Sequence, residues 1–274
     1  MNSAHWTRRI ERADHLASVY PFAAEGLRFY SRTTAIQRDL YDQFRRLSTL
    51  PTRISAERPL RDDFELSSLA PKFSGFLAAI AEISPTPVAR AAAALERKTG
   101  GAWEQLLRGF WLSDLETARP DGQSDDAERL LAWIFLQPYA EFLADRREAS
   151  QENGTPFSCP LCGAKPIVGV LRREGDGARK ALICMLCAHE WNFRRLLCPN
   201  CGEEREPQLA FYSAPEIRHV RVDVCDTCHS YLKSVDLTKT GLAVPVVDEL
   251  ATLPLDLWAR QHGYQKLQIN ILGM

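Results

Sequence analysis

The spacing of apolar residues along the chain changes near residue 150. Between residues 14 and 148, apolar side chains recur mostly at steps of three or four, which is typical of helices with one buried face. After residue 157 the chain shows short apolar runs and alternation separated by turn residues, which is typical of strands. We therefore expect an α+β multidomain protein whose N-terminal part is an all-α helical bundle.

The N-terminal pattern predicts five or six helices. Pro21 should break the first of them, because proline lacks the backbone N–H that a helix interior requires. Residues 1–12, which include Arg9, are expected to be a loose and solvated start, and the polar segment 149–155 is expected to be a linker. Helical segments are predicted at 14–47, 64–83, 88–98 (ended by Gly100-Gly101), 102–115 and 125–147, with a turn at 119–124.

Two similar hairpins are predicted after the linker. They pair 165–172 with 181–183, and 208–212 with 217–224. In the last of these strands Val220, Val222 and Val224 alternate with polar residues, as in a half-buried strand. A helix interrupted by Pro254 is expected at 246–261, followed by a short strand or tail.

All eight cysteines lie between residues 159 and 228, in four Cys-x-x-Cys pairs. Two residues between cysteines allow a tight turn to point both sulfurs at one metal ion, about 2.3 Å from each sulfur. Proline after the first cysteine fixes φ, and glycine after the second readily takes a positive φ, as in the CPxCG sequences at 159–163 and 198–202. Four such pairs in so short a stretch indicate two closed four-sulfur metal sites.

Sequential pairing of the Cys-x-x-Cys turns gives two tandem units of one small rubredoxin-like or zinc-ribbon type. Interleaved pairing, first with third and second with fourth, is the alternative. In the sequential scheme the metal ligands are Cys159, Cys162, Cys184 and Cys187 in site 1, and Cys198, Cys201, Cys225 and Cys228 in site 2. The expected domains are a bundle (1–150), a first metal unit (151–196), a second metal unit (197–240), and a C-terminal helix and tail (241–274). Each site is expected to hold one ion, and tetrahedral sulfur suits iron and zinc alike.

Other roles fit the cysteines less well. Disulfide frameworks belong mainly to small secreted domains, whereas residues 1–12 lack the apolar core of a signal peptide, so we expect a cytoplasmic protein. A thioredoxin-like motif needs one exposed Cys-x-x-Cys pair that opens a helix. His189 and His229 lie beside the pairs, but each site already has four sulfurs. Saturated sites lack the open position of a Lewis-acid catalyst, so we expect no enzyme and no catalytic residue.

Charge argues against a nucleic-acid partner. The whole chain carries a formal charge of −1, and residues 159–233 contain 11 Lys and Arg against 9 Asp and Glu. Zinc ribbons that bind nucleic acid usually have a clear basic surplus. The basic pairs at 172–173, 179–180 and 194–195 are instead expected to neutralise the metal–thiolate centres. No apolar run is long enough to cross a membrane.

The residues between and after the cysteines extend this pattern. They read Cys159-Pro160-x-Cys162-Gly163, Cys184-x-x-Cys187-x-x-Glu190-Trp191, Arg195-x-x-Cys198-Pro199-x-Cys201-Gly202, and Asp223-x-Cys225-Asp226-x-Cys228-x-x-Tyr231-Leu232-Lys233. A later segment, Asp248–Ala259, reads DELATLPLDLWA. Over about residues 157–260 the chain resembles the formate dehydrogenase accessory proteins of the FdhE family.

The resemblance implies a non-catalytic cytoplasmic protein that helps respiratory formate dehydrogenase to become active and contacts its catalytic subunit. It also implies rubredoxin-like sites, which favours iron over zinc. Glu190, Trp191, Tyr231 and Lys233 are then candidates for a docking surface, or else for packing around the metal units. Two other functions stay open: a rubredoxin-like electron-transfer protein that serves the same enzyme, and a zinc-ribbon protein that binds nucleic acid.

Overall fold

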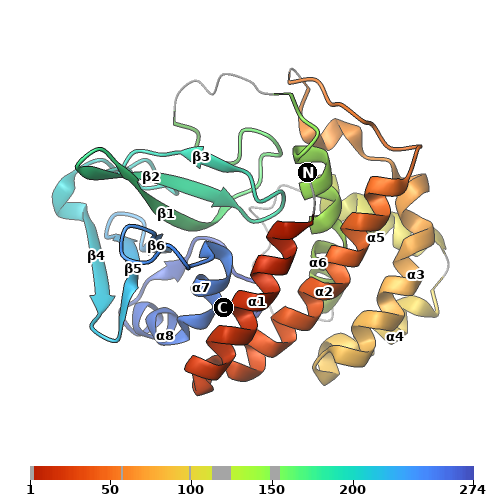
Figure 1. Cartoon of the computed structure of the whole chain (residues 1–274), viewed down its shortest axis with the longest axis horizontal. Helices are drawn as coiled ribbons and strands as arrows, with labels where there is room; N and C mark the ends of the chain where they lie inside the picture. The colour runs from red at the N-terminus through yellow and green to blue at the C-terminus, as the bar shows by residue number, and fades with distance from the viewer. Residues whose placement is uncertain (1–2, 57, 99, 113–124, 149–154) are drawn as a thin grey trace. The chain divides into compact units, whose positions relative to one another are not determined.

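The chain forms two compact units in the computed structural model, and Figure 1 labels their elements. The described residues are 3–56, 58–98, 100–112, 125–148 and 155–274, so the turn predicted at 119–124 and nearly all of the predicted linker lie outside them. The first unit comprises residues 1–10 and 31–150, and the second comprises 11–30 and 151–274. Residues 11–30 thus group with the cysteine-containing part, and the expected division into four domains stays a prediction.

Six α-helices precede the sheet among the described residues. As predicted, Pro21 separates the first two, and a short 3-10 turn begins at this proline. The helices are α1 (Ala4–Val19), α2 (Ala24–Arg46), α3 (Leu66–Ile83), α4 (Thr86–Glu96), α5 (Gly100–Leu112) and α6 (Asp125–Ala144). The helical segments predicted from apolar spacing are confirmed, although Gly100 and Gly101 begin α5 rather than ending α4.

The expected loose start of the chain is wrong, because α1 begins at Ala4. Trp6 is fully buried in the first unit, and the guanidinium carbon of Arg9 lies 4.6 Å from the centre of its ring. Arg9 is also buried, and its Nη1 donates a 2.7 Å hydrogen bond to Oε1 of Glu141 on α6. A carboxylate from a distant helix therefore compensates a charge that was expected to face water.

The second unit is built on one seven-stranded sheet. The strands are β1 (Pro166–Glu174), β2 (Gly177–Cys184), β3 (Glu190–Asn192), β4 (Leu209–Ala214), β5 (Ile217–Cys225), β6 (Ser230–Asp236) and β7 (Gln265–Lys266). Their order is β3-β2-β1-β6-β5-β4, and β7 pairs with β6. The β1–β6 and β6–β7 pairs are parallel and the others are antiparallel.

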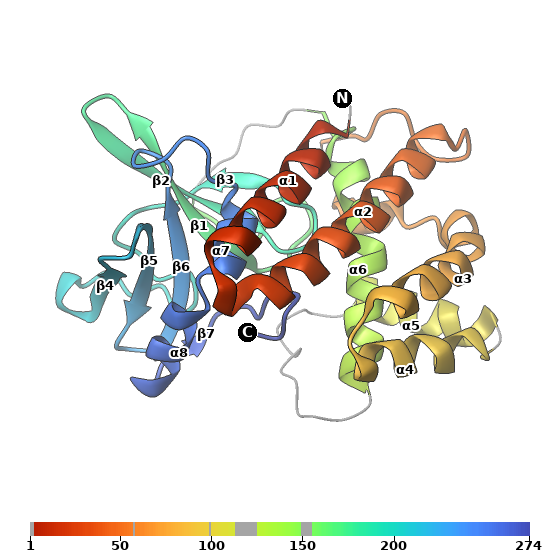
Figure 2. The same ribbon diagram turned by 60° about the horizontal axis from the view of Figure 1, so that its bottom comes forward.

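The sheet contains the same plan twice. A Cys-x-x-Cys turn, a hairpin, a second Cys-x-x-Cys turn and a strand follow one another in each half, so both predicted hairpins and the tandem repeat are confirmed. The junction was not predicted, because β6 of the second half pairs in parallel with β1 of the first. Figure 2 shows β1 and β6 side by side at the middle of the sheet. Six of the seven residues of β6 are buried, as expected of a central strand.

Two short helices, α7 (Pro245–Ala251) and α8 (Leu253–Gln261), cover one side of the sheet. Lys233 points to this side, because its ammonium group reaches residues of both helices. Val222 is paired in register with Lys233 and therefore shares that side. The break between α7 and α8 falls at Thr252, two residues before the predicted break at Pro254, because proline fits the first turn of a helix.

Gly169 of β1 lies on the other side of the sheet, in register with Ser234 of β6. A Cβ at this glycine would overlap Oγ of Ser234 and would lie 3.6 Å from Cε of Lys180. We therefore expect Gly169→Ala to lower the free energy of unfolding, measured by chemical denaturation, by about 1–3 kcal/mol. The double variant Gly169→Ala/Ser234→Ala lacks the overlapping hydroxyl. Its loss of unfolding free energy should therefore be smaller than the sum of the losses in the two single variants. Strictly additive losses would show that the two side chains do not collide.

Candidate metal centres

The first Cys-x-x-Cys turn of each half closes through a backbone hydrogen bond. The N–H of Gly163 donates to the carbonyl of Cys159 at 2.8 Å, and the N–H of Gly202 donates to the carbonyl of Cys198 at 3.1 Å. Both glycines have positive φ, 74° and 76°, where a Cβ would be strained. The CPxCG sequences therefore form the turns that their proline and glycine predict.

The second turn of each half reaches the same conformation without glycine. Ala188 follows Cys187 with φ of 54°, and His229 follows Cys228 with φ of 53°. Residues other than glycine rarely adopt this region. All four turns thus have a positive φ after their second cysteine, although only two have glycine there. His229 thus has a backbone position equivalent to a glycine, and neither His189 nor His229 belongs to the cysteine groups of the described residues.

The eight cysteines gather in two groups of four, and the groups are the sequential ones rather than the interleaved ones. Within each group the sulfurs all lie within 4.8 Å of one another. The close sulfur pairs are Cys159–Cys187 at 3.6 Å, Cys162–Cys184 at 3.4 Å, Cys198–Cys228 at 3.7 Å and Cys201–Cys225 at 3.7 Å. Four sulfurs held about 2.3 Å from a central ion are about 3.8 Å apart in a tetrahedron, so both groups can each hold one ion.

Backbone N–H groups also point at the sulfurs. The N–H groups of Leu186 and Cys187 lie 3.3 and 3.5 Å from Sγ of Cys184. In the second cluster the N–H of Asn200 lies 3.4 Å from Sγ of Cys198. Hydrogen bonds donated to a sulfur favour its thiolate form, which is the form that binds metal.

The first cluster needs a cation to become fully ionised. Burial raises the pKa of Cys184 and Cys187 well above the usual thiol value, and Cys159 and Cys162 raise it further. Hydrogen bonds from the other three cysteines lower the pKa of Cys162. Four thiolates so close together repel one another, and a metal ion at their centre removes this repulsion and displaces the protons.

The two clusters differ in their access to solvent. All four cysteines of the first cluster are buried, whereas Cys201 is exposed and Cys228 is half-buried in the second. Burial opposes ionisation of Cys228, but hydrogen bonds from Ser230 and Asn200 outweigh it and lower the pKa of this thiol to about 6. The second cluster therefore offers an incoming ligand or oxidant a direct approach.

This difference predicts two rates of metal release. In excess EDTA we expect one ion per chain to leave several-fold faster than the other, because the second cluster can exchange ligands without an opening of the sheet. Time-resolved metal analysis of the released ion would measure both phases. Cys201→Ser should remove the fast phase and leave the slow one. A single phase in the unsubstituted protein would contradict the assignment.

The basic residues near the clusters pair with carboxylates. Arg172 donates two hydrogen bonds of 2.6 Å to Glu190. Lys180, which is buried, lies 2.8 Å from Asp223, and Arg194 lies 2.7 Å from Glu204. These three side chains therefore pair with carboxylates, and not with the thiolates that they were expected to neutralise.

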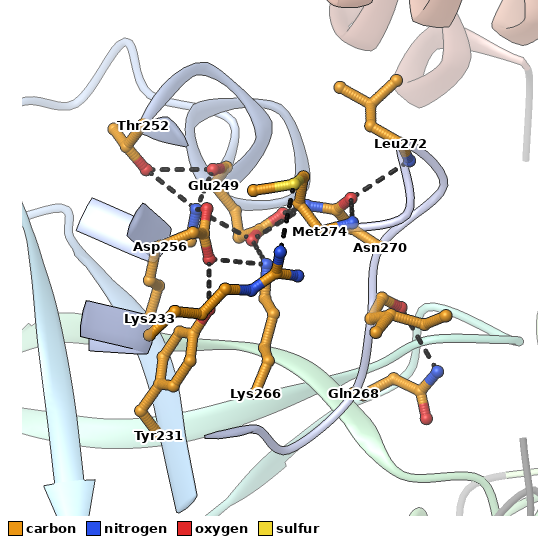
Figure 3. Close-up of polar contacts among 12 residues, drawn as sticks. Tyr231, Lys233, Glu249, Thr252, Asp256, Lys266, Gln268, Asn270, Leu272 and Met274 are labelled. Atoms are coloured by element: carbon orange, nitrogen blue, oxygen red, sulfur yellow. Dashed lines mark hydrogen bonds and ion pairs between the residues drawn. The ribbon is translucent and has the colours of Figure 1, made fainter. Parts of the chain in front are cut away.

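The four residues considered for a docking surface are mostly inside the protein. Trp191, Tyr231 and Lys233 are at most 1% exposed, and only Glu190, the partner of Arg172, is partly accessible. Packing is therefore the correct interpretation for the three buried side chains. Figure 3 shows that Tyr231 and Lys233 join a polar cluster under α7 and α8.

This buried cluster contains two ammonium and two carboxylate groups. Lys233 Nζ lies 3.0 Å from Glu249 Oε1 and contacts Asp256 Oδ2 at 2.5 Å. Lys266 Nζ contacts Glu249 as well and lies 3.0 Å from Asp256 Oδ1. Tyr231 donates a 2.8 Å hydrogen bond to Asp256. The cluster connects β6, α7, α8 and β7. It could not be predicted from the sequence, because the charged residues of segment 248–259 follow no period that would indicate burial.

Among the described residues, no helix combines the length and the apolar character needed to cross a membrane. Two family models match adjoining parts of the chain. The central domain of FdhE matches residues 158–195, and the C-terminal domain of FdhE matches residues 196–272. Together they span both cysteine clusters and the buried charge cluster.

Relatives and a solved structure carry the same name. A "Protein FdhE homolog" of Aquifex aeolicus is 35% identical over 59% of this chain, an alignment that spans only 58% of that relative. A homologue from Haemophilus ducreyi is 28% identical over 97% of this chain and 88% of its own length. The crystal structure of the FdhE protein from Pseudomonas aeruginosa matches with a TM-score of 0.75 at 25% identity, covering 99% of this chain and 96% of that one. Sequence and fold thus agree along the chain, which belongs to the FdhE family.

Proposed function

We propose that this protein is a non-catalytic accessory factor for the maturation of respiratory formate dehydrogenase, and that it docks on the catalytic subunit of that enzyme. The family match over residues 158–272, which includes all eight cysteines, is the observation that carries the proposal. Cysteines that stand in metal-type clusters rather than in disulfides also suit a reducing compartment, so the cytoplasm is the proposed location.

The geometry of the clusters supports a structural role for the metal. In each cluster four sulfurs surround one point, so a bound ion has no open position for a substrate. The two clusters lie at turns that adjoin the strands of one sheet. We propose that the eight cysteines each ligate one of two ions, with iron favoured over zinc, and that the ions hold the sheet on which the partner docks.

Co-purification tests the docking proposal. The tagged full-length chain, produced in its own organism while respiratory formate dehydrogenase is being made, should retain the catalytic subunit of that enzyme. Deleting the gene should lower the activity of the enzyme while its catalytic subunit is still synthesised. Unchanged activity in the deletion strain, with no retained subunit, would refute the proposal.

The exposure of the second cluster favours one competing function, electron transfer to the same enzyme. Cys201 is exposed, so an electron could pass between an iron ion at this site and a partner. This function requires iron and a reversible one-electron couple, which metal analysis, optical spectra and voltammetry would reveal. A colourless protein with about two zinc ions per chain, purified from iron-replete cells, would exclude it.

A further inference from the structure

Strand β4 forms one outer end of the sheet. Among the described residues β4 pairs with β5 alone, and Figures 1 and 2 both show it at the margin of the sheet. The opposite end is β3, which has only three residues and is blunted by the ion pair of Glu190 with Arg172. The two ends of the sheet are therefore not equivalent.

The register shows which backbone groups of β4 face outward. The N–H of Asp226 donates to the carbonyl of Gln208, so Leu209 and Cys225, which lie between them, form a pair without mutual hydrogen bonds. Every second residue from Leu209 then points its N–H and C=O away from β5. These residues are Leu209, Phe211 and Ser213, and their side chains lie on the side of the sheet opposite α7 and α8.

The edge carries neither of the two residue types that most often prevent strand pairing, a charged residue or a proline, and its register with β5 shifts only at its end, between Ser213 and Ala214. Its sequence, LAFYSA, contains no charge and no proline. Phe211 is 61% exposed and Tyr212 is 44% exposed, one on each side of the sheet. Natural edge strands are usually protected by lysine, proline, shortness or a covering element, so an uncovered apolar edge of six residues indicates a binding function.

A cavity of about 380 Å³ adjoins this edge on the Phe211 side. Its lining includes Phe211, three cationic side chains (Lys180, Arg195, Arg221) and a single carboxylate, Asp223. The guanidinium of Arg221 lies 4.6 Å from the ring centre of Phe211, so a positive group stands directly beside the outward-facing backbone. Cys198 and Cys225 of the second cluster also line the cavity, and their metal–thiolate charge would repel an anion there. Arg221 lies 2.7 Å from Asp223, and Lys180 lies 2.8 Å from the same carboxylate. Two cations therefore share one carboxylate and keep a surplus positive charge, which favours an anionic group near Arg221.

We propose that the free edge of β4 binds an extended segment of the catalytic subunit, which adds to the sheet as a further strand and places an acidic side chain near Arg221. Main-chain hydrogen bonds to residues 209, 211 and 213 supply the attachment, and side chains beside Phe211 and in the cavity supply the selectivity. This inference rests on the proposed function, because it names the surface through which that function is exercised.

The test compares two substitutions at one position. Phe211→Ala and Phe211→Pro both remove the ring, but only the proline removes an outward N–H, and neither removes a hydrogen bond to β5. With the full-length chain and the purified catalytic subunit, we expect Phe211→Pro to bind about five- to tenfold more weakly than Phe211→Ala, the effect of one main-chain hydrogen bond. Metal content and thermal melting should be the same for both variants.

Two further variants test the proposal even if Phe211→Pro does not fold. Ser213→Lys places a charge on the exposed edge without altering the backbone, and it should also weaken binding. Arg195→Glu, at an exposed position of the cavity, should weaken binding of overlapping peptides from the catalytic subunit that contain Asp or Glu, and should leave apolar peptides unaffected. Glu204→Gln, away from the cavity lining, serves as the control.

The possible outcomes separate this inference from the proposed function. If the unsubstituted chain binds the subunit and the alanine and proline variants bind equally, strand addition is wrong while the docking function stands. If the unsubstituted chain binds no catalytic subunit, the docking function itself is wrong. If the proline abolishes only self-association, measured by sedimentation, the edge serves a second copy of this chain and the inference is overturned.

Discussion

Replacing Cys184 by serine is expected to release the ion of the first cluster and to unfold much of the sheet. Cys184 is buried at the end of β2, and its sulfur lies 3.4 Å from that of Cys162. Structural zinc sites of this type contribute about 10–16 kcal/mol of apparent binding free energy in peptides, and that energy is coupled to folding. Loss of one buried ligand should therefore cost several kcal/mol, more than a typical single substitution.

Two measurements on the same sample test this expectation. Metal analysis should show a fall from about two ions per chain to about one, and circular dichroism should show a lower melting temperature together with lost strand signal. Cys201→Ser is the matched control, because it removes a ligand of the exposed cluster by the same chemical change. It should also release one ion but destabilise the protein less. Equal destabilisation by both variants would show that burial does not distinguish the clusters.

The cysteine clusters could be predicted because their information is local. Spacing within Cys-x-x-Cys fixes the direction of two sulfurs, and hairpin-length inserts bring the second turn back to the first. The start of β5 at Ile217 is as predicted from the turn residues directly before it, whereas β2 begins at Gly177, before the predicted start at 181. The sequential grouping of the cysteines needed no long-range contact beyond one hairpin.

Contacts between segments far apart in the chain could not be predicted, because no local sequence pattern indicates them. The parallel pairing of β1 with β6 joins residues more than 60 positions apart, such as Gly169 and Ser234, and both hairpins could have formed without it. Ala188 and His229 adopt positive φ only because the fold imposes the turn that glycine signals elsewhere. The free edge of β4 likewise became visible only once the strand order was known.

Buried charges were the least predictable feature, because charged residues normally face water. Arg9 in the first unit was expected to face water, and Lys233 in the second was a candidate either for a docking surface or for packing. Each is buried against a carboxylate from another element. For Asp256, burial alone would raise the pKa, but Lys233 and Lys266 lower it and hold the carboxylate ionised. Such pairs are specified by contacts that no sequence period reveals.

Lys233→Met should be among the most destabilising single substitutions outside the cysteines. The side chain is 0% exposed, and besides its two carboxylates it donates to the carbonyl of Glu249 and to Oγ1 of Thr252. Methionine leaves two buried carboxylates facing one ammonium, that of Lys266. Breaking a buried ion pair in this way costs about 3–5 kcal/mol, which corresponds to roughly 10–15 °C in melting temperature.

A second substitution tests whether the loss comes from charge imbalance. Lys233→Met/Asp256→Asn again has equal numbers of buried positive and negative groups, so it should be more stable than Lys233→Met alone, although it carries an additional change. Arg194→Met is the surface control: it breaks an ion pair whose side chains are each 55% exposed and should cost less than about 1 kcal/mol. If the double variant were the less stable, lost packing and hydrogen bonds rather than unpaired charge would explain the effect, and the cluster would have to be regarded as a hydrogen-bond network whose ionisation is incidental.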